Sequence, residues 1–358
     1  IFALLNYKNK QITNDDIIQM SNAGKHRGPE SSNLIFSVNN NDIVFGFHRL
    51  AINGLTTVSD QPFNIDNCVL ICNGEIYNYK KLYNELNIIP KTSSDCEVII
   101  YLYKKFGIEN TVQMLDGVFS FILHDNINDK IYIARDPYGV RPLFKYKLNS
   151  NSDIYGFASE LKQLYPLKYN YEEGTIEQFS PGTYEVYGIS VNKYELEKEK
   201  CYNTFNFNTL EIENKENWEL YYNLIRNKFE EAVKKRVETT ERPIACLLSG
   251  GLDSSLVTSL VKKYYTGSQL ETYSIGLEGA EDLKYAKQVA EFLNTKHTEI
   301  IVSETDFFNA IPEVIEKIES YDTTTVRASV GNYLIGKYIR AHSDAKVIFN
   351  GDGSDELC

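Results

Sequence analysis

The sequence predicts two domains of different classes, an α+β domain followed by an α/β domain built on a parallel sheet. Its 358 residues exceed what one ordinary hydrophobic core organises, which indicates two domains. The first half contains short β-like runs separated by turns, whereas strands and helices alternate from Pro243 onward. The first pattern predicts stacked antiparallel sheets flanked by helices, and the second predicts a parallel sheet covered on both faces.

The first domain is predicted from six apolar runs with strand character. They are IFALLNY, DIVFGFHRLAI, CVLICNGEIYN, VFSFILHD, KIYIARD and DIYGFASE. Helical signals are brief in this half, as in YKKLYNELN and DCEVIIYLYKKFG. We place this domain at residues 1–190. A polar, asparagine-rich stretch at residues 191–215 is weakly patterned and predicts an inter-domain linker.

The second domain, residues 216–358, opens with a helical pattern. Its expected anchors are Leu220, Leu224, Phe229 and Val233. The expected strands are IACLLSG, ETYSIGL, HTEIIV and AKVIFNG, and the helices between them include SSLVTSLVKKY and DLKYAKQVAEFLN. Ligands of parallel sheets bind beyond the carboxyl ends of the strands, so the loops that follow these strands are the expected place of a site.

Composition is ordinary for a globular protein and excludes several partners. Hydrophobic residues make up 42% of the chain, and the net charge of -12 argues against nucleic acid or an anionic membrane surface as the main partner. No apolar run approaches the length of a membrane span, and no signal peptide is visible. The six cysteines lack the spacing of a zinc site or a disulfide framework. We expect a cytoplasmic protein with reduced, mostly buried thiols.

Neither end of the sequence has the character of a natural terminus. The chain begins at Ile1 without an initiator Met and stops at Cys358, directly after a carboxylate-rich loop. We expect further residues on both sides.

The most informative motif is LLSGGLDSS, residues 247–255, between an expected strand and an expected helix. Two glycines permit a tight turn and a close approach of the backbone to phosphate oxygens. Serine hydroxyls and the free amides of a helix start suit a polyanion, and Asp253 suits magnesium that bridges phosphates. A glycine turn capped by Asp or Ser is the ordinary alternative. The pattern S-G-G-x-D-S at a strand–helix junction is much more specific than such a turn, and it differs from the G-x-x-x-x-G-K-[ST] loop.

Two further motifs accompany this loop. NGDGSDEL directly follows an expected strand and places Asp352, Asp355 and Glu356 at the same edge of the sheet. These carboxylates repel one another unless a cation neutralises them, so substrate or magnesium binding is favoured over an acidic surface turn. YDTTTVRAS offers hydroxyls and a guanidinium near a helix start, which suit a carboxylate or phosphate. Taken alone, this string is a weak signal.

Three segments of the first half together indicate an amide-binding site. HRLAI supplies Arg49, a candidate bidentate clamp for a carboxylate. CNGEIYN supplies the Asn73 amide and the Gly74 N–H, a donor pair suited to an oxyanion. TSSDCEVI places Asp95 at a helix start, where it can accept from an ammonium group. The alternatives are a hairpin turn at Asn73-Gly74 and a simple helix cap at Asp95.

The motifs together resemble a known family. Seven segments resemble the class II glutamine amidotransferase domain: IFALL, HRGP, HRLAI, CNGEIYN, SDCEVI, LDGVFSF and RDPYGVRPLF. The synthetase domain of the asparagine synthetase B family is resembled by LLSGGLDSS, YSIG, YDTTTVRAS and NGDGSDEL. The resemblance covers nearly the whole sequence in the family's domain order. It implies an N-terminal-nucleophile αββα sandwich, followed by an adenine nucleotide α-hydrolase-like α/β domain of the ATP pyrophosphatase class.

For the first domain the resemblance implies a glutamine site. Its members would be Arg49 at the carboxylate, Asp95 at the amino group, Asn73 and Gly74 at the oxyanion, and Glu75. In the family, the nucleophile is the N-terminal Cys of a Cys-Gly pair that stands just before the segment matching Ile1. No other cysteine can replace it, because the α-amino group of that Cys is the base.

For the second domain the resemblance implies an ATP and aspartate site. The ATP-binding residues would be Leu248, Ser249, Gly250, Gly251, Asp253, Ser254, Ser255, Ile275, Asn350 and Gly351. Asp253 and Asp355 would hold Mg²⁺. Thr324, Thr325 and Arg327 would stabilise the aspartyl-adenylate and its attack by ammonia.

The implied reaction has two halves. ATP and aspartate give β-aspartyl-AMP and pyrophosphate, and ammonia from glutamine then attacks the adenylate. Asp352 would act in forming the adenylate and stands where the family commonly has Glu in S-G-E-G-S-D-E. Its side chain is one methylene shorter, which withdraws the charge by about 1 Å. The sequence is silent on oligomeric state, although the family commonly dimerises.

Several alternatives remain open. One is another ATP-dependent amide or β-lactam ligase on this scaffold, or a synthetase that has lost glutaminase chemistry and uses ammonia. The others are a non-catalytic module derived from an enzyme and a glutaminase that feeds another acceptor. The intact set of Arg49, Asn73, Gly74 and Asp95 argues against lost glutaminase chemistry. Intact SGGLDSS and TTVRAS argue against a non-catalytic protein.

Overall fold

The computed structural model describes residues 1–10, 12–36, 42–148, 154–170, 174–190, 193–203 and 218–354. The chain divides into two compact units, unit 1 (Ile1–Asn208) and unit 2 (Thr209–Cys358). Each unit is described by itself.

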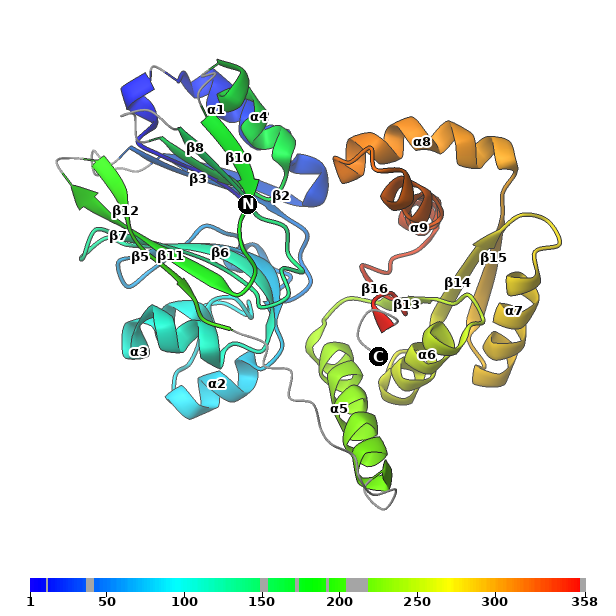
Figure 1. Ribbon diagram of the computed structural model, residues 1–358. Coiled ribbons are helices and arrows are strands. Elements are labelled where there is room, and N and C mark those ends of the chain that lie inside the picture. The colour runs from blue at the N-terminus through cyan, green and yellow to red at the C-terminus, as the bar shows by residue number, and fades with distance from the viewer. Residues whose placement is uncertain are drawn as a thin grey trace. The chain divides into compact units, whose positions relative to one another are not determined.

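Unit 1 contains two antiparallel sheets (Figure 1). In the first sheet the order is β10 (Gly174–Gln178), β8 (Phe144–Leu148), β9 (Tyr155–Ala158), β1 (Phe2–Leu5), β3 (Ile43–Arg49) and β2 (Ser31–Phe36). In the second it is β12 (Lys193–Cys201), β11 (Thr183–Ser190), β7 (Lys130–Arg135), β6 (Gly117–Asp125), β5 (Cys68–Ile76) and β4 (Phe63–Ile65).

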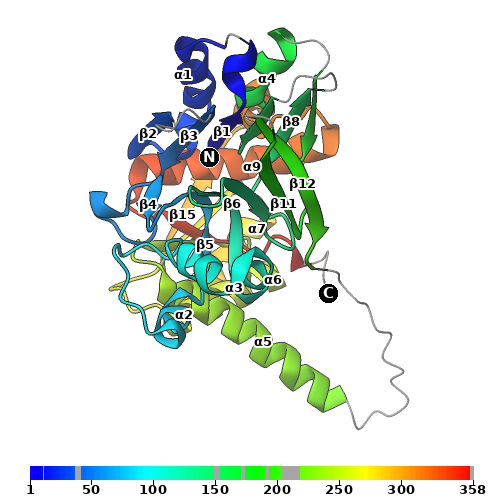
Figure 2. The same cartoon turned by 90° about the vertical axis from the view of Figure 1, so that its left-hand side faces the viewer.

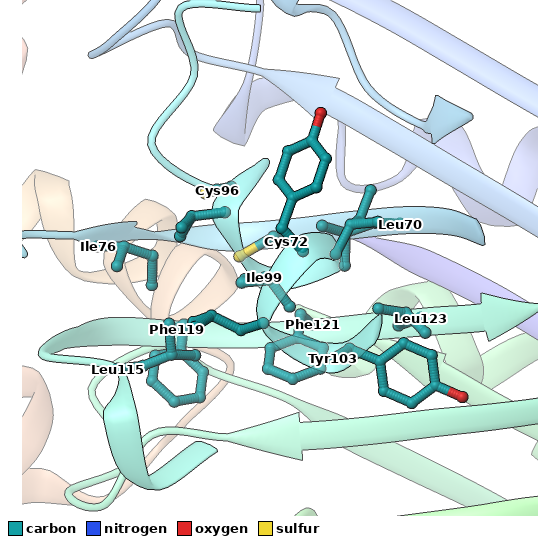
Figure 3. Packing of buried hydrophobic residues seen from close by; sticks show 14 of the residues in the cluster. Leu70, Cys72, Ile76, Cys96, Ile99, Tyr103, Leu115, Phe119, Phe121 and Leu123 are labelled. Carbon is teal, nitrogen blue, oxygen red and sulfur yellow. The ribbon is translucent and has the colours of Figure 1, made fainter. Parts of the chain in front are cut away.

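Alternation along the strands sorts the side chains of unit 1 into layers. Ala3 and Leu5 of β1 point between the sheets, whereas Phe2 and Leu4 point outward under α1 (Asn14–Asn22) and α4 (Leu161–Asn170). Helices α2 (Tyr79–Leu86) and α3 (Val98–Met114) cover the outer face of the second sheet. The packing beneath them is drawn in Figure 3, and Figure 2 shows both helix pairs outside the sheets. The expected αββα sandwich is confirmed.

The expected linker is wrong in its first part. Residues 193–201 form β12, which pairs with β11 along its length. Tyr194 is buried between the sheets, while most of the other side chains are charged and at least partly exposed. Charged side chains are typical of an edge strand, and they gave this strand the composition of a linker. The remainder of the expected linker, from residue 204 to residue 215, lies outside the described residues.

Unit 2 is built on a parallel sheet. The order is β15 (Lys296–Ile301), β14 (Glu271–Gly276), β13 (Ile244–Leu247) and β16 (Val347–Phe349). The helices are α5 (Trp218–Thr239), α6 (Leu252–Tyr264), α7 (Glu281–Leu293), α8 (Glu304–Ile318) and α9 (Thr323–His342). Helices α5 and α6 bury Val237 and Val261 against Cys246 of β13. Helix α9 packs Ile335 against Ala245 and Tyr273 on the opposite face. The expected parallel sheet, covered on both faces, is confirmed.

Two of the anchors expected in α5 are wrong. Leu220 and Leu224 are 58% and 48% exposed, whereas Val233 is buried and Phe229 packs beside it. Among the described residues, α5 therefore meets the core of unit 2 through its C-terminal half.

Strand β13 lies between β14 and β16 in the sheet. The strands that follow β13 in the sequence are therefore added on both of its sides. In parallel sheets such a switch point opens a crevice at the carboxyl ends of the strands. The glycine loop follows β13 and the NGDGS loop follows β16. Among the described helices, none is both long and apolar enough to cross a membrane.

Candidate active sites in the two units

In unit 1, the end of β5 meets the other sheet through Asn73. The Asn73 side-chain amide lies 3.5 Å from Ser159 Oγ, and Ser159 follows β9 of the first sheet. The same hydroxyl lies 2.9 Å from the main-chain nitrogen of Ile1. Asn73 and the start of β1 are therefore neighbours in space.

Gly74 lies where two strands are in close contact. A Cβ added there would lie 2.5 Å from the carbonyl oxygen of Val118 on β6. This contact accounts for a glycine at position 74 without reference to an oxyanion. Asn73 and Gly74 lie within β5, paired with Ser120 and Phe119, so the hairpin-turn alternative is wrong.

Arg49, at the end of β3, is buried and holds the loop that follows it. Its Nη1 donates to the Thr56 carbonyl at 3.0 Å and to Asp60 Oδ1 at 2.6 Å. Its Nη2 donates to the Asn53 carbonyl at 3.2 Å and to the Gly54 carbonyl. A guanidinium has five N–H groups, and these bonds use four of them. In this structure the paired N–H groups needed for a bidentate clamp are engaged by the protein itself.

Asp95 is buried beside β5. Its carboxylate accepts from the Ile76 N–H at 2.7 Å. Burial raises the pKa of Asp95 to about 6, with a smaller contribution from the nearby Glu75 and against the opposing effect of that hydrogen bond. Helix α3 begins at Val98 with Glu97 at its N-cap position, so Asp95 does not cap it. The helix-cap alternative is wrong.

Glu75 lies on the same stretch of β5. It accepts a hydrogen bond from Arg141 Nη2 at 3.2 Å. Asn73, Glu75 and Asp95 are thus gathered around the carboxyl half of β5, with Arg49 behind the adjoining loop.

In unit 2, the glycine loop between β13 and α6 is held by its own serines. Ser254 Oγ lies 3.2 Å from the Ser249 N–H and 2.9 Å from the Ser249 hydroxyl. Gly250 has a φ of +85°, which a side chain rarely adopts. Gly251 is the N-cap of α6 and supplies no side-chain cap. The first amides of α6 therefore point out of the helix, which suits an anion.

The glycine loop and the NGDGS loop line one cavity of about 530 Å³. Gly351 lies so close to the start of α6 that an added Cβ would be 2.8 Å from the Ser254 nitrogen. The expected residues that line this cavity are Leu248, Ser249, Gly251, Asp253, Ser254, Ile275, Asn350, Gly351 and Asp352. Gly250 and Ser255 belong to the loop but do not line the cavity.

Sequence reasoning missed part of the lining. Asp282, Leu283, Asn332 and Ile335 lie outside every motif. The other additional residues belong to the motifs but were not expected to bind ATP: Leu247, Tyr273, Ser274, Ala328, Gly353 and Ser354. Asp282 lies in the first turn of α7, the helix after β14. Its place after a strand is the same signal that identified the glycine loop.

The threonine hydroxyls and the guanidinium of YDTTTVRAS do not line the cavity in this structure, although Ala328 of the same motif does. Thr324, Thr325 and Arg327 are exposed and are not among its lining residues. Thr325 hydrogen-bonds to Asp322, the N-cap of α9, over 2.8 Å. Helix α9 instead contributes residues 328, 332 and 335, whose spacing places them on one face.

Metal ligands are sparse within the described ranges. The described residues contain no group of three or more His, Cys, Asp or Glu side chains arranged to hold a metal ion. Asp253 and Asp352 line the same cavity, and Asp355 lies outside the described residues. Mg²⁺ is commonly held in proteins by one or two carboxylates together with substrate phosphates, so this donor set fits a phosphate-bound ion.

The fold and the two sites define a class of protein in which an amidotransferase-type sandwich is joined to a unit with an ATP-pyrophosphatase-type loop. Residues 1–186 match the glutamine amidotransferase domain family, and residues 224–358 match the asparagine synthase family. The chain therefore belongs to the glutamine amidotransferase domain family, and its second part matches the asparagine synthase family.

The similarity to characterised relatives extends over most of the chain. The chain is 40% identical over 349 residues to the glutamine-hydrolysing asparagine synthetase of Homo sapiens, and 41% identical over 360 residues to that of Bos taurus. Each alignment covers 93% of this chain and 62% of the relative. The glutamine PRPP amidotransferase of B. subtilis aligns at a TM-score of 0.46 with 13% identity, covering 85% of this chain and 90% of that one. Family membership rests on the sequence matches.

Proposed function

We propose that this protein makes asparagine from aspartate and ATP, with glutamine or ammonia as the nitrogen donor. The observation that carries the proposal is the cavity of unit 2, where the glycine loop after β13 and the NGDGS loop after β16 meet. The relatives that match 93% of the chain are named glutamine-hydrolysing asparagine synthetases, which supports the same activity.

In the proposed mechanism, ATP binds with its phosphates at the start of α6. The uncapped amides of α6 and the hydroxyls of Ser249 and Ser254 would hold phosphate oxygens. Asp253 and Asp355 would hold Mg²⁺. That ion would neutralise charge on the phosphates and on the departing pyrophosphate. Ile275, at the end of β14, and Leu248 would contact the nucleoside.

The aspartate half-reaction follows from this placement. The side-chain carboxylate of aspartate attacks the α-phosphorus of ATP, pyrophosphate leaves, and β-aspartyl-AMP forms. Ammonia then attacks the acyl carbon, and AMP leaves. We assign Asp352 to adenylate formation because it lines the cavity beside the glycine loop. Thr324, Thr325 and Arg327 would need to approach the intermediate from the exposed first turn of α9.

We further propose that unit 1 binds glutamine at the end of β5. Asn73 and Gly74 would stabilise the oxyanion, and Asp95 would accept from the α-ammonium group. Arg49 would act mainly through the loop that it holds, because four of its N–H groups are engaged there. In the family, the cysteine nucleophile precedes the segment matching Ile1, and Ile1 lies beside Ser159 and Asn73 here.

Location and assembly are part of the proposal. We propose a cytoplasmic homodimer whose partners are small-molecule substrates. The cysteines described in the structure are free thiols, of which Cys201 is exposed and Cys68, Cys72, Cys96 and Cys246 are buried, in keeping with a reducing compartment.

The proposed function is tested by intact mass and pyrophosphate release on one sample of the full-length protein. Aspartate-dependent release of pyrophosphate with glutamine, together with an N-terminal Cys-Gly in the mass, is the expected result. Turnover with ammonium but not with glutamine would support the proposed synthetase activity and contradict the proposed glutaminase activity. If aspartate stimulates release with neither donor, the substrate assignment is wrong and another ligase becomes the leading interpretation.

A further inference from the structure

Asp352 in unit 2 stands on a short loop that does not by itself fix the direction of its side chain. The loop follows β16 in the order Asn350, Gly351, Asp352 and Gly353. Glycine has the largest conformational freedom of all residues. Gly353 has a φ of +93°, and an added Cβ there would meet no atom within 4 Å. Since one side of the loop is open, other groups have to orient the Asp352 carboxylate.

Two side-chain amides hold this carboxylate by the same oxygen. Asn350 Nδ2 donates to Asp352 Oδ2 at 2.7 Å, and Asn332 Nδ2 donates to the same atom at 3.4 Å. Among the described residues, no hydrogen bond reaches the other oxygen, Asp352 Oδ1. The protein thus binds one oxygen and leaves the second one for a ligand.

Both amides come from elements that are anchored on the parallel sheet. Asn350 directly follows β16, which pairs with β13. Asn332 lies on α9 about one turn before Ile335, whose side chain is buried against residues of β13 and β14. Because the glycine loop also follows β13, these hydrogen bonds fix the Asp352 carboxylate relative to the proposed phosphate site.

The three side chains are within reach of a ligand. Asn332, Asn350 and Asp352 are exposed, and all of them line the cavity of unit 2. An error of about 1 Å in the position of a reacting group can cost about a hundredfold in rate, so the orientation of this carboxylate matters. Asn350 and Asp352 also depart together from S-G-E-G-S-D-E, which has Ser and Glu at these places. A shorter carboxylate is thus accompanied by a longer donor.

We propose that Asn350, supported by Asn332, is a positioning residue that acts through Asp352 and orients its carboxylate for adenylate formation. The inference rests on the proposed synthetase function. It gives Asn350 a role in the rate of the reaction, whereas the family resemblance implies a role in ATP binding. It also adds Asn332, which lies outside every motif.

The experiment is a double-substitution cycle that measures aspartate-dependent pyrophosphate release by the full chain. Asn350→Ala should lower kcat about tenfold and leave the KM for ATP unchanged, because it removes a hydrogen bond to a charged group and no contact with the nucleotide. Asn332→Ala removes the longer bond and should lower kcat about threefold. Asp352→Asn should lower kcat about a hundredfold, and adding Asn350→Ala to it should cost less than about twofold more.

A second variant and a matched control accompany the cycle. Asn350→Ser should give about the same loss as Asn350→Ala, because its hydroxyl stands on a shorter side chain. Asn309→Ala is the control. Asn309 is an exposed asparagine of α8 that does not line the cavity, so its substitution should leave kcat and KM unchanged.

The possible outcomes separate this inference from the proposed function. A loss of about a thousandfold in the double variant, as expected for independent effects, would overturn the inference. An unchanged kcat in Asn350→Ala, with or without a raised KM for ATP, would overturn it too. In both cases the unaltered protein is active and the proposed function stands. If the unaltered protein shows no aspartate-dependent release, the proposed function fails and the inference fails with it.

Discussion

At the scale of single residues, the burial of Asp95 predicts that glutamine affinity depends on pH. Its pKa is raised to about 6 by burial, so the ligand-free protein carries it largely protonated below that pH. An ionised carboxylate binds an ammonium group much more strongly than a neutral carboxyl group does, because the opposite charges attract. Glutamine affinity should therefore fall about tenfold for each pH unit below about 6 and level off above it.

Calorimetric titration of glutamine between about pH 5 and about pH 7.5 checks this. Asp95→Asn should bind more weakly and show a flat profile in that range. An unaltered protein whose affinity is constant across the range would remove Asp95 from the ammonium site.

Asp352 is the residue on which the synthetase proposal depends most directly. Its Oδ2 accepts from the side-chain amides of Asn350 at 2.7 Å and Asn332 at 3.4 Å, so its carboxylate is held toward the cavity. Asp352→Asn should slow aspartate-dependent pyrophosphate release by about a hundredfold, because a charge placed for the transition state is lost. Asp352→Glu keeps the charge and should retain most of the activity.

Steady-state kinetics with saturating ATP checks this prediction. Asp344→Asn, an exposed carboxylate of the same unit that does not line the cavity, is the control and should leave the rate unchanged. Equal rates for Asp352→Asn and the unaltered protein would contradict the role of Asp352.

At the scale of elements, the turn from β13 into α6 depends on one glycine more than on its neighbour. Gly250 has a φ of +85°, and its added Cβ would lie 2.5 Å from the Ala286 nitrogen of α7. Gly250→Ala therefore combines backbone strain of about 1–2 kcal/mol with a clash against main chain. It should lower the unfolding midpoint of unit 2 and weaken ATP binding at least about tenfold.

Gly251→Ala is the matched control for this turn. Gly251 has a φ of -69°, and the nearest atom to its added Cβ is Ser249 Oγ at 3.4 Å. Thermal denaturation should show a small effect for this variant. Equal losses of thermal stability for the two substitutions would mean that the positive φ of Gly250 does not set the stability of the turn.

At the scale of the whole molecule, a buried ion pair joins the two sheets of unit 1. Lys145 of β8 donates to Glu185 of β11 at 2.6 Å, and each side chain is at most 6% exposed. The Tyr187 hydroxyl also donates to Glu185. Lys145→Met leaves a buried carboxylate without its cation and should cost about 3–5 kcal/mol of unfolding free energy.

Denaturant unfolding followed at unit 1 checks this, and two variants control it. Lys145→Met combined with Glu185→Gln removes both charges, keeps an acceptor for Tyr187, and should recover most of the loss. Lys81→Ala breaks the exposed pair with Glu85 in the same unit and should cost less than about 1 kcal/mol. A Lys145→Met variant as stable as the unaltered protein would show that the pair does not hold the sheets together.

Much of the fold could be predicted because its causes are local. The runs around β1, β5, β13 and β14 are apolar, short and bounded by turns, and each is a strand in the structure. The glycine loop was also predictable, since its chemistry lies within consecutive residues. Residues 193–201 were misassigned because an edge strand needs only one neighbour and keeps polar side chains.

What the sequence by itself determined was the order and type of the main elements and the motifs at their ends. Tertiary structure decided which of those residues meet. It brought Asp282 and Asn332 into the cavity, left Thr324, Thr325 and Arg327 on an exposed turn, and turned Arg49 toward its own loop. It also packed the loop after Arg49 against the residue that precedes Asp95, although the two segments are distant in sequence. The physical reason is that hydrogen bonds and burial depend on contacts across strands and loops, which periodicity and spacing along one segment do not contain.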